Sequence, residues 1–162
     1  VQGFISDETV FLKPDPSNTI TVPGNSRLPI TVGAYDHRNN SIYIHSSRGY
    51  ISRDSVKPDL AAPGVQIYGP VPGNRVHSGI PENTQTFTHR TGTSAAAAIT
   101  AGAVANLLNW GIVMGNYPTM SEASIKSYLI RGASRNPSLS YPNREFGYGT
   151  LDLLQTFLKL RE

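Results

Sequence analysis

The sequence of 162 residues contains no cysteine, which excludes disulfide scaffolds, zinc–thiolate and iron–sulfur centres, and thiol nucleophiles together. Charge is also scarce: charged residues make up 15% of the chain, and the formal net charge is only +3. The basic residues are scattered singly, and the aromatic residues are not interleaved with them. The sequence therefore offers no surface on which nucleic-acid bases could stack beside positive charge. We therefore expect no nucleic-acid partner.

Metal and phosphate motifs are missing from the sequence as well. It has no D-x-D-x-D-G calcium loop, no HExxH pair and no glycine-rich phosphate loop, so we expect no metal and no cofactor. One uncharged stretch, 95–114, is long enough to span a bilayer. It is mostly Ala and Gly and includes Thr100, Asn106 and Asn109, which favours a helix buried on all sides in a protein core. We expect no membrane partner.

The pattern of apolar residues changes near Arg90. Before it, short apolar runs are separated by Pro, Gly and Asn, which is typical of strands. The expected strands are 19–22, 30–35, 41–45, 65–68 and 85–89. After Arg90 the spacing becomes helical, and the expected helices are 94–114, 121–131 and 152–160. Strands first and helices later predict an α/β or α+β layer structure.

Several residues are expected to end these elements. Asn39 and Asn40 predict a turn between two strands. Thr119 and Glu122 have the spacing of a capping box, and Gly132 is suited to ending the helix they begin. Asp152 is the expected cap of the last helix.

The segment GTSAA (92–96) stands between an expected strand and the alanine-rich helix. Ser94 would lie at the helix N-terminus, where free N–H groups favour developing negative charge. Gly92 would let a substrate backbone come close, and the alanines would pack tightly under the serine. The alternative is that Thr93 or Ser94 is only an N-cap. On these five residues alone, both interpretations stand.

Further segments occur in order around this motif, and together they resemble the C-terminal half of subtilisin-like serine proteases (subtilases). They are ITVGA (30–34), SSRG (46–49), KPDLAAPG (57–64), GTSAA (92–96) and FGYGTLD (146–152). The resemblance covers about 19–157. It implies an α/β fold with a mostly parallel sheet and a central buried helix that carries the nucleophile. Segments 9–16, 109–113 and 128–133 look like the clostridial spore-germination, Csp-type branch.

The resemblance implies roles for a run of residues before and at the helix. Ser94 would be the catalytic nucleophile, and Thr93 with the Ser94 N–H would line the oxyanion pocket. Arg90 and Thr91 would lie on the leaving-group side of the cleft, and residues 21–24 near the wall of the pocket before the scissile bond. The substrate would be a peptide or protein. The family's location would be secreted, in the cell envelope or associated with the spore.

The family motif is not matched at every position. Ala98 and Ile99 stand where the family has Pro and a structural His, Ala95 stands where many relatives have Met, and Gly102 matches. The His is not the catalytic base in the family, so Ile99 does not argue against activity.

The family's catalytic Asp, His and oxyanion Asn precede the serine, so the resemblance places all three before Val1. We expect residues 1–18 to lead in from an upstream region and 19–162 to form the C-terminal part of a catalytic domain. The N-terminal portion of the same protease is then a partner, and the isolated chain is expected to self-associate. The histidines at 37, 45, 77 and 89 are expected to be solvated or turn-bonded, and Asp36, Asp59 and Asp152 to be turn, strand-end and cap residues.

Two other serine-enzyme motifs are incomplete in this sequence. An α/β-hydrolase elbow needs a second Gly where Ala96 stands, and a Ser-x-x-Lys acyl-enzyme needs Lys where Ala97 stands. A pseudoprotease remains a true alternative: a catalytically dead subtilase-like sensor or scaffold in spore germination. It would share the fold and the GTS segment but lack the base.

Overall fold

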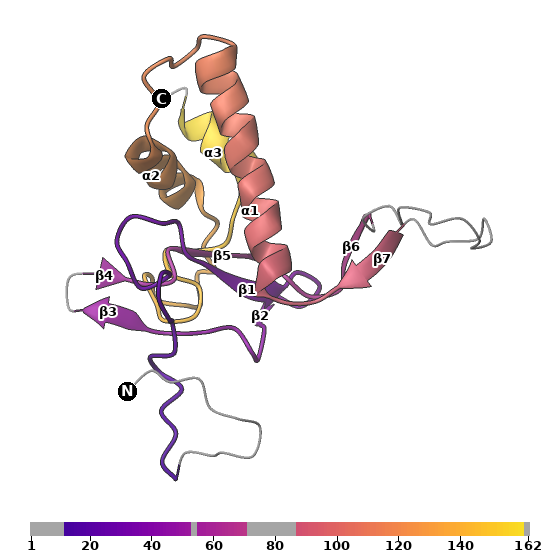
Figure 1. Cartoon of the computed structure of the whole chain (residues 1–162), viewed down its shortest axis with the longest axis vertical. Helices are drawn as coiled ribbons and strands as arrows, with labels where there is room; N and C mark the ends of the chain where they lie inside the picture. Colours follow the sequence, from indigo (N-terminus) through magenta and orange to yellow (C-terminus); the bar gives the residue numbers. More distant parts are fainter. Residues whose placement is uncertain (1–11, 53–54, 71–86, 161–162) are drawn as a thin grey trace, which may run out of the picture.

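The computed structural model describes residues 12–52, 55–70 and 87–160 (Figure 1). The elements follow one another as β1 (Val32–Asp36), β2 (Ser41–Ile42), β3 (Tyr50–Ser52), β4 (Ser55–Val56), β5 (Leu60–Pro63), β6 (Ile67–Pro70), β7 (Phe87–Arg90), α1 (Thr93–Leu108), the π-helix η1 (Asn109–Val113), α2 (Glu122–Gly132) and α3 (Leu153–Lys159). The α/β class expected from the sequence is confirmed.

The three-stranded sheet has the strand order β2-β1-β5. β1 and β5 are parallel, with Val32 opposite Leu60 and Ala34 opposite Ala62. β2 returns antiparallel to β1 after the expected asparagine turn, where Asn40 has a left-handed φ of 58°. Two antiparallel pairs, β3-β4 and β6-β7, extend to either side of this sheet.

The two faces of the β1-β5 pair are covered by different segments. Side chains alternate along a strand, so Ala34 and Ala62 face α1 and pack with its Ala96. Tyr35 and Ala61 face the opposite way and pack against Phe146 from the segment before α3. The sheet is therefore buried on both faces at the point where α1 begins.

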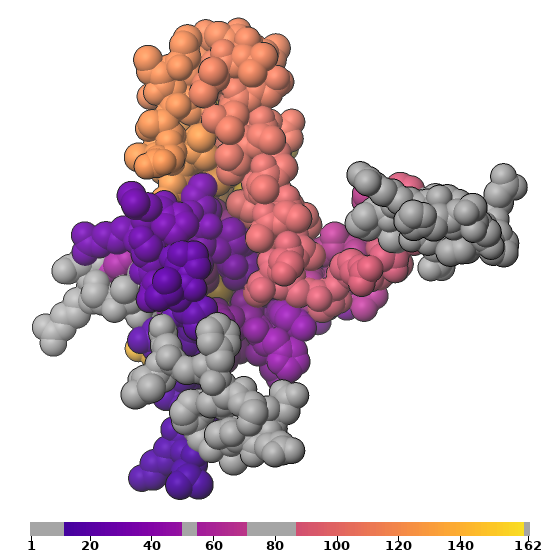
Figure 2. Space-filling model, in the orientation of Figure 1, coloured from indigo at the N-terminus to yellow at the C-terminus, as the bar shows by residue number. Residues whose placement is uncertain are grey.

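Helix α1 is buried along one face only, so the described residues do not supply the enclosure on all sides that its composition predicts. Ala96, Thr100, Ala103 and Leu107 recur every three or four residues and are buried, whereas Ala97, Ala98, Ala101, Gly102 and Ala105 are exposed. In Figure 2, α1 forms an uncovered column on the face in view. By length and composition, Thr93–Val113 would also suit a membrane span, and 28% of its most apolar window is buried.

The main apolar core lies where the helices meet above the sheet. Leu107 of α1, Ile125 and Leu129 of α2, and Leu60 of β5 are buried together there. The π-helix that continues α1 brings Gly111 so close to Met120 that a Cβ on the glycine would lie 2.7 Å from the Met120 Cε. The end of α1 is thereby locked to the connection that leads into α2.

The ends of α2 differ from expectation. Its N-cap is Ser121, which forms a reciprocal capping box with Ser124, so the Thr119–Glu122 pairing is wrong. Serine serves at both positions because each hydroxyl accepts from the other residue's backbone amide, Ser124 Oγ at 2.8 Å and Ser121 Oγ at 3.3 Å. Gly132, the residue expected to stop the helix, is its last helical residue, and Ala133 is the C-cap. A Cβ on Gly132 would collide with Thr156 of α3, so this glycine permits close packing of the two helices.

The expected cap of α3 is confirmed, since the Asp152 carboxylate accepts from the Gln155 amide at 2.9 Å. The strand expected at 19–22 is wrong: the Thr19 amide bonds to the Arg48 carbonyl, and the chain then turns, with the Asn25 amide bonded to the Thr21 carbonyl. β1 is confirmed, whereas the strand at 41–45 shortens to β2, because the Ser46 amide turns back to bond the Tyr43 carbonyl. The strands at 65–68 and 85–89 correspond to β6 and β7, with 85–86 outside the described residues.

Candidate active site

The serine lies at the junction between β7 and α1. Gly92 is the N-cap of α1 and has a φ of 150°, which side chains other than hydrogen rarely tolerate. Its amide donates to the Gly64 carbonyl at 2.7 Å, and its carbonyl accepts from the Ala95 amide at 3.1 Å. Space above Gly92 is open, because a Cβ there would meet nothing closer than the Ser94 amide nitrogen at 3.9 Å.

The side chain of Ser94 is exposed and has no hydrogen-bond partner among the described residues. The N-cap position belongs to Gly92, and no side chain caps the helix. The simple capping interpretation of Thr93 and Ser94 is therefore wrong. The hydroxyl of Ser94 is left at a helix N-terminus whose N–H groups and positive dipole end stabilise negative charge.

The turn after β5 supports this junction, and the sequence analysis did not find this contact. A Cβ on Gly64 would lie 2.6 Å from the Ala34 Cβ and 2.9 Å from the Gly92 oxygen, so only glycine fits there. Gln66, with a φ of 53°, donates its amide to the Thr91 hydroxyl at 2.9 Å. Gly64 of the KPDLAAPG segment and Gln66 just after it thus support the loop that leads into α1. Arg90 is exposed at the end of β7, opposite Ile67.

A pocket of about 200 Å³ opens beside this junction. It brings Thr93 together with residues 21–24, which are about seventy positions earlier in the chain, as the sequence resemblance implied. Its lining contains no charged side chain and consists of Ile20, Thr21, Val22, Pro23, Gly24, Thr31, Val32, Ser47, Pro58 and Thr93.

Behind the pocket lies a buried ion cluster. The Asp59 carboxylate accepts from the Lys57 ammonium at 2.7 Å through one oxygen and from the Lys126 ammonium at 2.8 Å through the other. Asp59 is thus more than a strand-end residue, because it joins Lys57, two residues before it, to Lys126 of α2. Burial lowers the pKa of Lys57, against the opposing effect of Asp59, and the like charge of Lys126 lowers this pKa further.

No described histidine is bonded to Ser94. His45 packs edge-on against Tyr43 with ring centroids 5.3 Å apart, and His89 packs against Tyr68 at 4.9 Å. His37 is exposed in the asparagine turn, and His77 lies outside the described residues. Within the ranges that the structure describes, Ser94 has no base in contact with it.

The remaining acidic residues lie away from the serine. Asp36 is the turn residue expected: Arg38 donates to its carboxylate through the backbone amide at 3.0 Å and the guanidinium at 2.6 Å and 2.9 Å. These hydrogen bonds lower the pKa of Asp36 to about 2. The described residues contain no group of three or more His, Asp or Glu side chains that could hold a metal ion.

The mixed α/β structure of this chain is similar to that of subtilisin-like protease domains. The sequence model of the subtilase family matches residues 11–149, and this chain belongs to that family.

Three relatives show the extent of the similarity. The structure of the Clostridium perfringens CspB protease is 36% identical, covers 95% of this chain and 31% of that protein, and superposes with a TM-score of 0.83. Serine protease AprX of Bacillus subtilis is 33% identical over 74% of this chain and 28% of its own length. Subtilisin DY of Bacillus licheniformis is 30% identical over 72% of this chain and 34% of its own length. The expected likeness to the Csp-type branch is confirmed, and the chain spans about a third of each relative.

Proposed function

We propose that the protein to which this chain belongs is a serine endopeptidase, and that Ser94 is the residue it acylates. The observation that carries the proposal is the position of the Ser94 hydroxyl. It is exposed, has no hydrogen-bond partner among the described residues, and lies at the N-terminus of α1 beside a pocket without charged side chains. The substrate is a peptide or protein, because the relatives are proteases.

Each residue at the start of α1 has a separate role in the proposed reaction. A base from outside the described residues takes the Ser94 proton while the hydroxyl oxygen attacks the peptide carbonyl. The Ser94 N–H, with Thr93, stabilises the oxyanion at the positive end of α1. Gly92 admits the substrate backbone. The amine leaves with a proton from the same base, and water then hydrolyses the acyl-enzyme ester. Arg90 and Thr91 contact the departing segment.

The nucleophile is tested by labelling the full-length protein with a fluorophosphonate probe. We expect labelling at Ser94 alone, and its complete loss in Ser94→Ala. The matched control is Ser127→Ala, which removes an exposed serine of α2 and should label as the unmodified protein does. A folded full-length protein that takes no label at Ser94 would contradict the proposal and leave the pseudoprotease as the function to test.

The isolated 162-residue chain is expected to hydrolyse peptides negligibly. In subtilisin, a member of the same family, losing a triad residue such as the base lowers kcat by about a millionfold. The measurement is peptide hydrolysis by the purified chain beside its Ser94→Ala variant. Turnover that disappears in the variant would show that one of the four histidines acts as a base.

We also propose that the upstream portion of the same protease covers the exposed face of α1. A groove of about 290 Å³ runs along that face, lined by residues of β1 and α1 such as Val32, Ala101 and Val104. An apolar groove of this kind usually marks an interface. Without the upstream portion, the isolated chain is expected to self-associate through this groove.

A further inference from the structure

The segment that forms one wall of the pocket has few bonds of its own. Between Ile20 and Thr31 it lies in turns, with the Asn25 amide bonded to the Thr21 carbonyl at 3.1 Å and the Ser26 amide to the Pro23 carbonyl at 3.0 Å. Ile20, at the start of the segment, is 6% exposed, whereas Val22 is 74% exposed, so apolar burial fixes the start of the wall but not its middle. The middle of the wall keeps its shape only if other parts of the molecule hold it.

The ion cluster behind the wall supplies this support. The Lys57 ammonium donates to the Pro29 carbonyl at 2.8 Å and to the Thr31 hydroxyl at 3.0 Å. The Thr31 hydroxyl donates in turn to the Gly24 carbonyl at 2.6 Å. The Thr31 amide donates to Asp59 at 2.7 Å. The wall residues Gly24 and Thr31 are thus joined to the buried charges by a continuous chain of hydrogen bonds.

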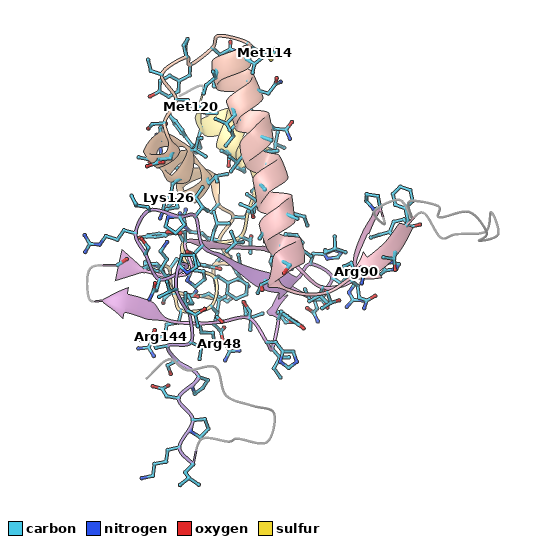
Figure 3. All side chains as sticks on the ribbon, viewed as in Figure 1. Arg48, Arg90, Met114, Met120, Lys126 and Arg144 are labelled. Atoms are coloured by element: carbon cyan, nitrogen blue, oxygen red, sulfur yellow. The ribbon has the colours of Figure 1, made fainter. Side chains whose placement is uncertain are left out.

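Lys126 connects this chain to a different part of the fold. Its ammonium donates to the Arg27 carbonyl at 2.9 Å and the Pro29 carbonyl at 3.3 Å, and pairs with Asp59 at 2.8 Å. Figure 3 shows Lys126 between α2 and the loop below that helix. Helix α2 is fixed in the core by Ile125 and Leu129, so its lysine is a rigid anchor for a loop almost one hundred residues away.

We propose that Lys126 is a positioning residue for substrate selection, which rests on the proposed function. By holding two carbonyls of segment 20–31, it fixes how far the wall stands from Thr93 and hence which side chain the pocket accepts. All the charges of the cluster lie outside the pocket lining, so the pocket takes one uncharged, mainly apolar side chain of the substrate. A displacement of about 1 Å in such a wall is enough to change rates substantially.

The variant that tests this is Lys126→Met in the full-length protease. Asp59 keeps its pair with Lys57, so the substitution leaves no unpaired buried charge, and the protein should fold. Lys126→Arg is the conservative rescue. The matched control is Arg131→Met, which removes the other cation of α2, one that lies 5.8 Å from the Tyr128 ring centre and does not contact the wall.

The first readout is hydrolysis of peptides that differ only in the residue before the scissile bond, Leu, Ala, Glu or Lys, normalised to the fluorophosphonate-reactive fraction. We expect Lys126→Met to raise KM for the Leu peptide about tenfold, with kcat changed less than about twofold, and to lower the Leu-to-Ala preference about tenfold. Lys126→Arg should restore most of this preference, and Arg131→Met should not alter it. A purely structural role would reduce the reactive fraction and leave the preference unchanged.

The second readout does not depend on activity. Amide hydrogen exchange of Asn25 and Ser26 should become about tenfold faster in Lys126→Met, with β1 and α2 unchanged. Unchanged exchange at these amides overturns the proposal, and so does faster exchange with an unaltered side-chain preference. If the unmodified protein turns over no peptide, the proposed function fails, and exchange alone decides whether Lys126 holds the wall.

Discussion

The two faces of α1 have nearly the same composition and very different surroundings. The inner face, with Ala96, Ala103 and Leu107, is buried against the sheet and the other helices. The outer face, with Ala97 and Ala101, is equally small and apolar but exposed. Small side chains allow close approach on either side, so the difference teaches that composition shows a helix can be enclosed, not which segment encloses it.

The largest expected effect comes from placing a charge on the outer face. Ala101→Glu should weaken assembly of this chain with a separately expressed upstream portion of the protease at least about a hundredfold, because an unpaired carboxylate would be buried at the contact. Binding is measured by titration, and recovered peptidase activity reports the same event.

Ala123→Glu is the matched control, since Ala123 is exposed on α2 and away from the groove. Equal affinity for the two variants would show that the outer face of α1 is not the covered surface.

The contribution of the inner face of α1 to stability is tested by a substitution that leaves a cavity in the core. Leu107 is fully buried, so Leu107→Ala should lower the free energy of unfolding of the full-length protein by about 3 kcal/mol. Urea unfolding measures this, beside Val113→Ala, which shortens a side chain that is 77% exposed and should change stability by less than about 0.5 kcal/mol. A similar loss in both would erase the distinction between enclosed and open parts of the helix.

The smallest effect on stability is expected for Asp36, the last residue of β1, which lies outside both faces of α1. The pKa of Asp36 is lowered from 3.8 to about 2 by its hydrogen bonds to Arg38, so its ionised form adds stability above about pH 4. This contribution decreases as the pH falls below about 4 and through 2. Asp36→Asn should therefore lower the Tm by about 2 °C or less at pH 6, and by clearly less at pH 2. A Tm difference as large at pH 2 as at pH 6 would show that the charge is not its cause.

Local patterns in the sequence were sufficient where the relevant contacts are local. The alternation in ITVGA gave β1, the three- and four-residue spacing after Ser94 gave α1, and Asp152 capped the helix that follows it. β5 was missed as a strand because it is only four residues long, begins two residues after Pro58 and ends on Pro63. The run 19–22 has the composition of a strand, but its amide partner is Arg48 and no strand lies beside it.

The candidate site divides in the same way. The sequence alone determined that Ser94 follows a strand and begins an alanine-rich helix, since these are neighbours in the chain. The tertiary structure decided that Gly92 rather than a side chain caps this helix, that Gly64 supports the loop and that Lys126 holds the pocket wall. These features depend on atoms brought together from segments 28 to 99 residues apart. Such contacts are set by how the strands and helices pack, and no local pattern records them.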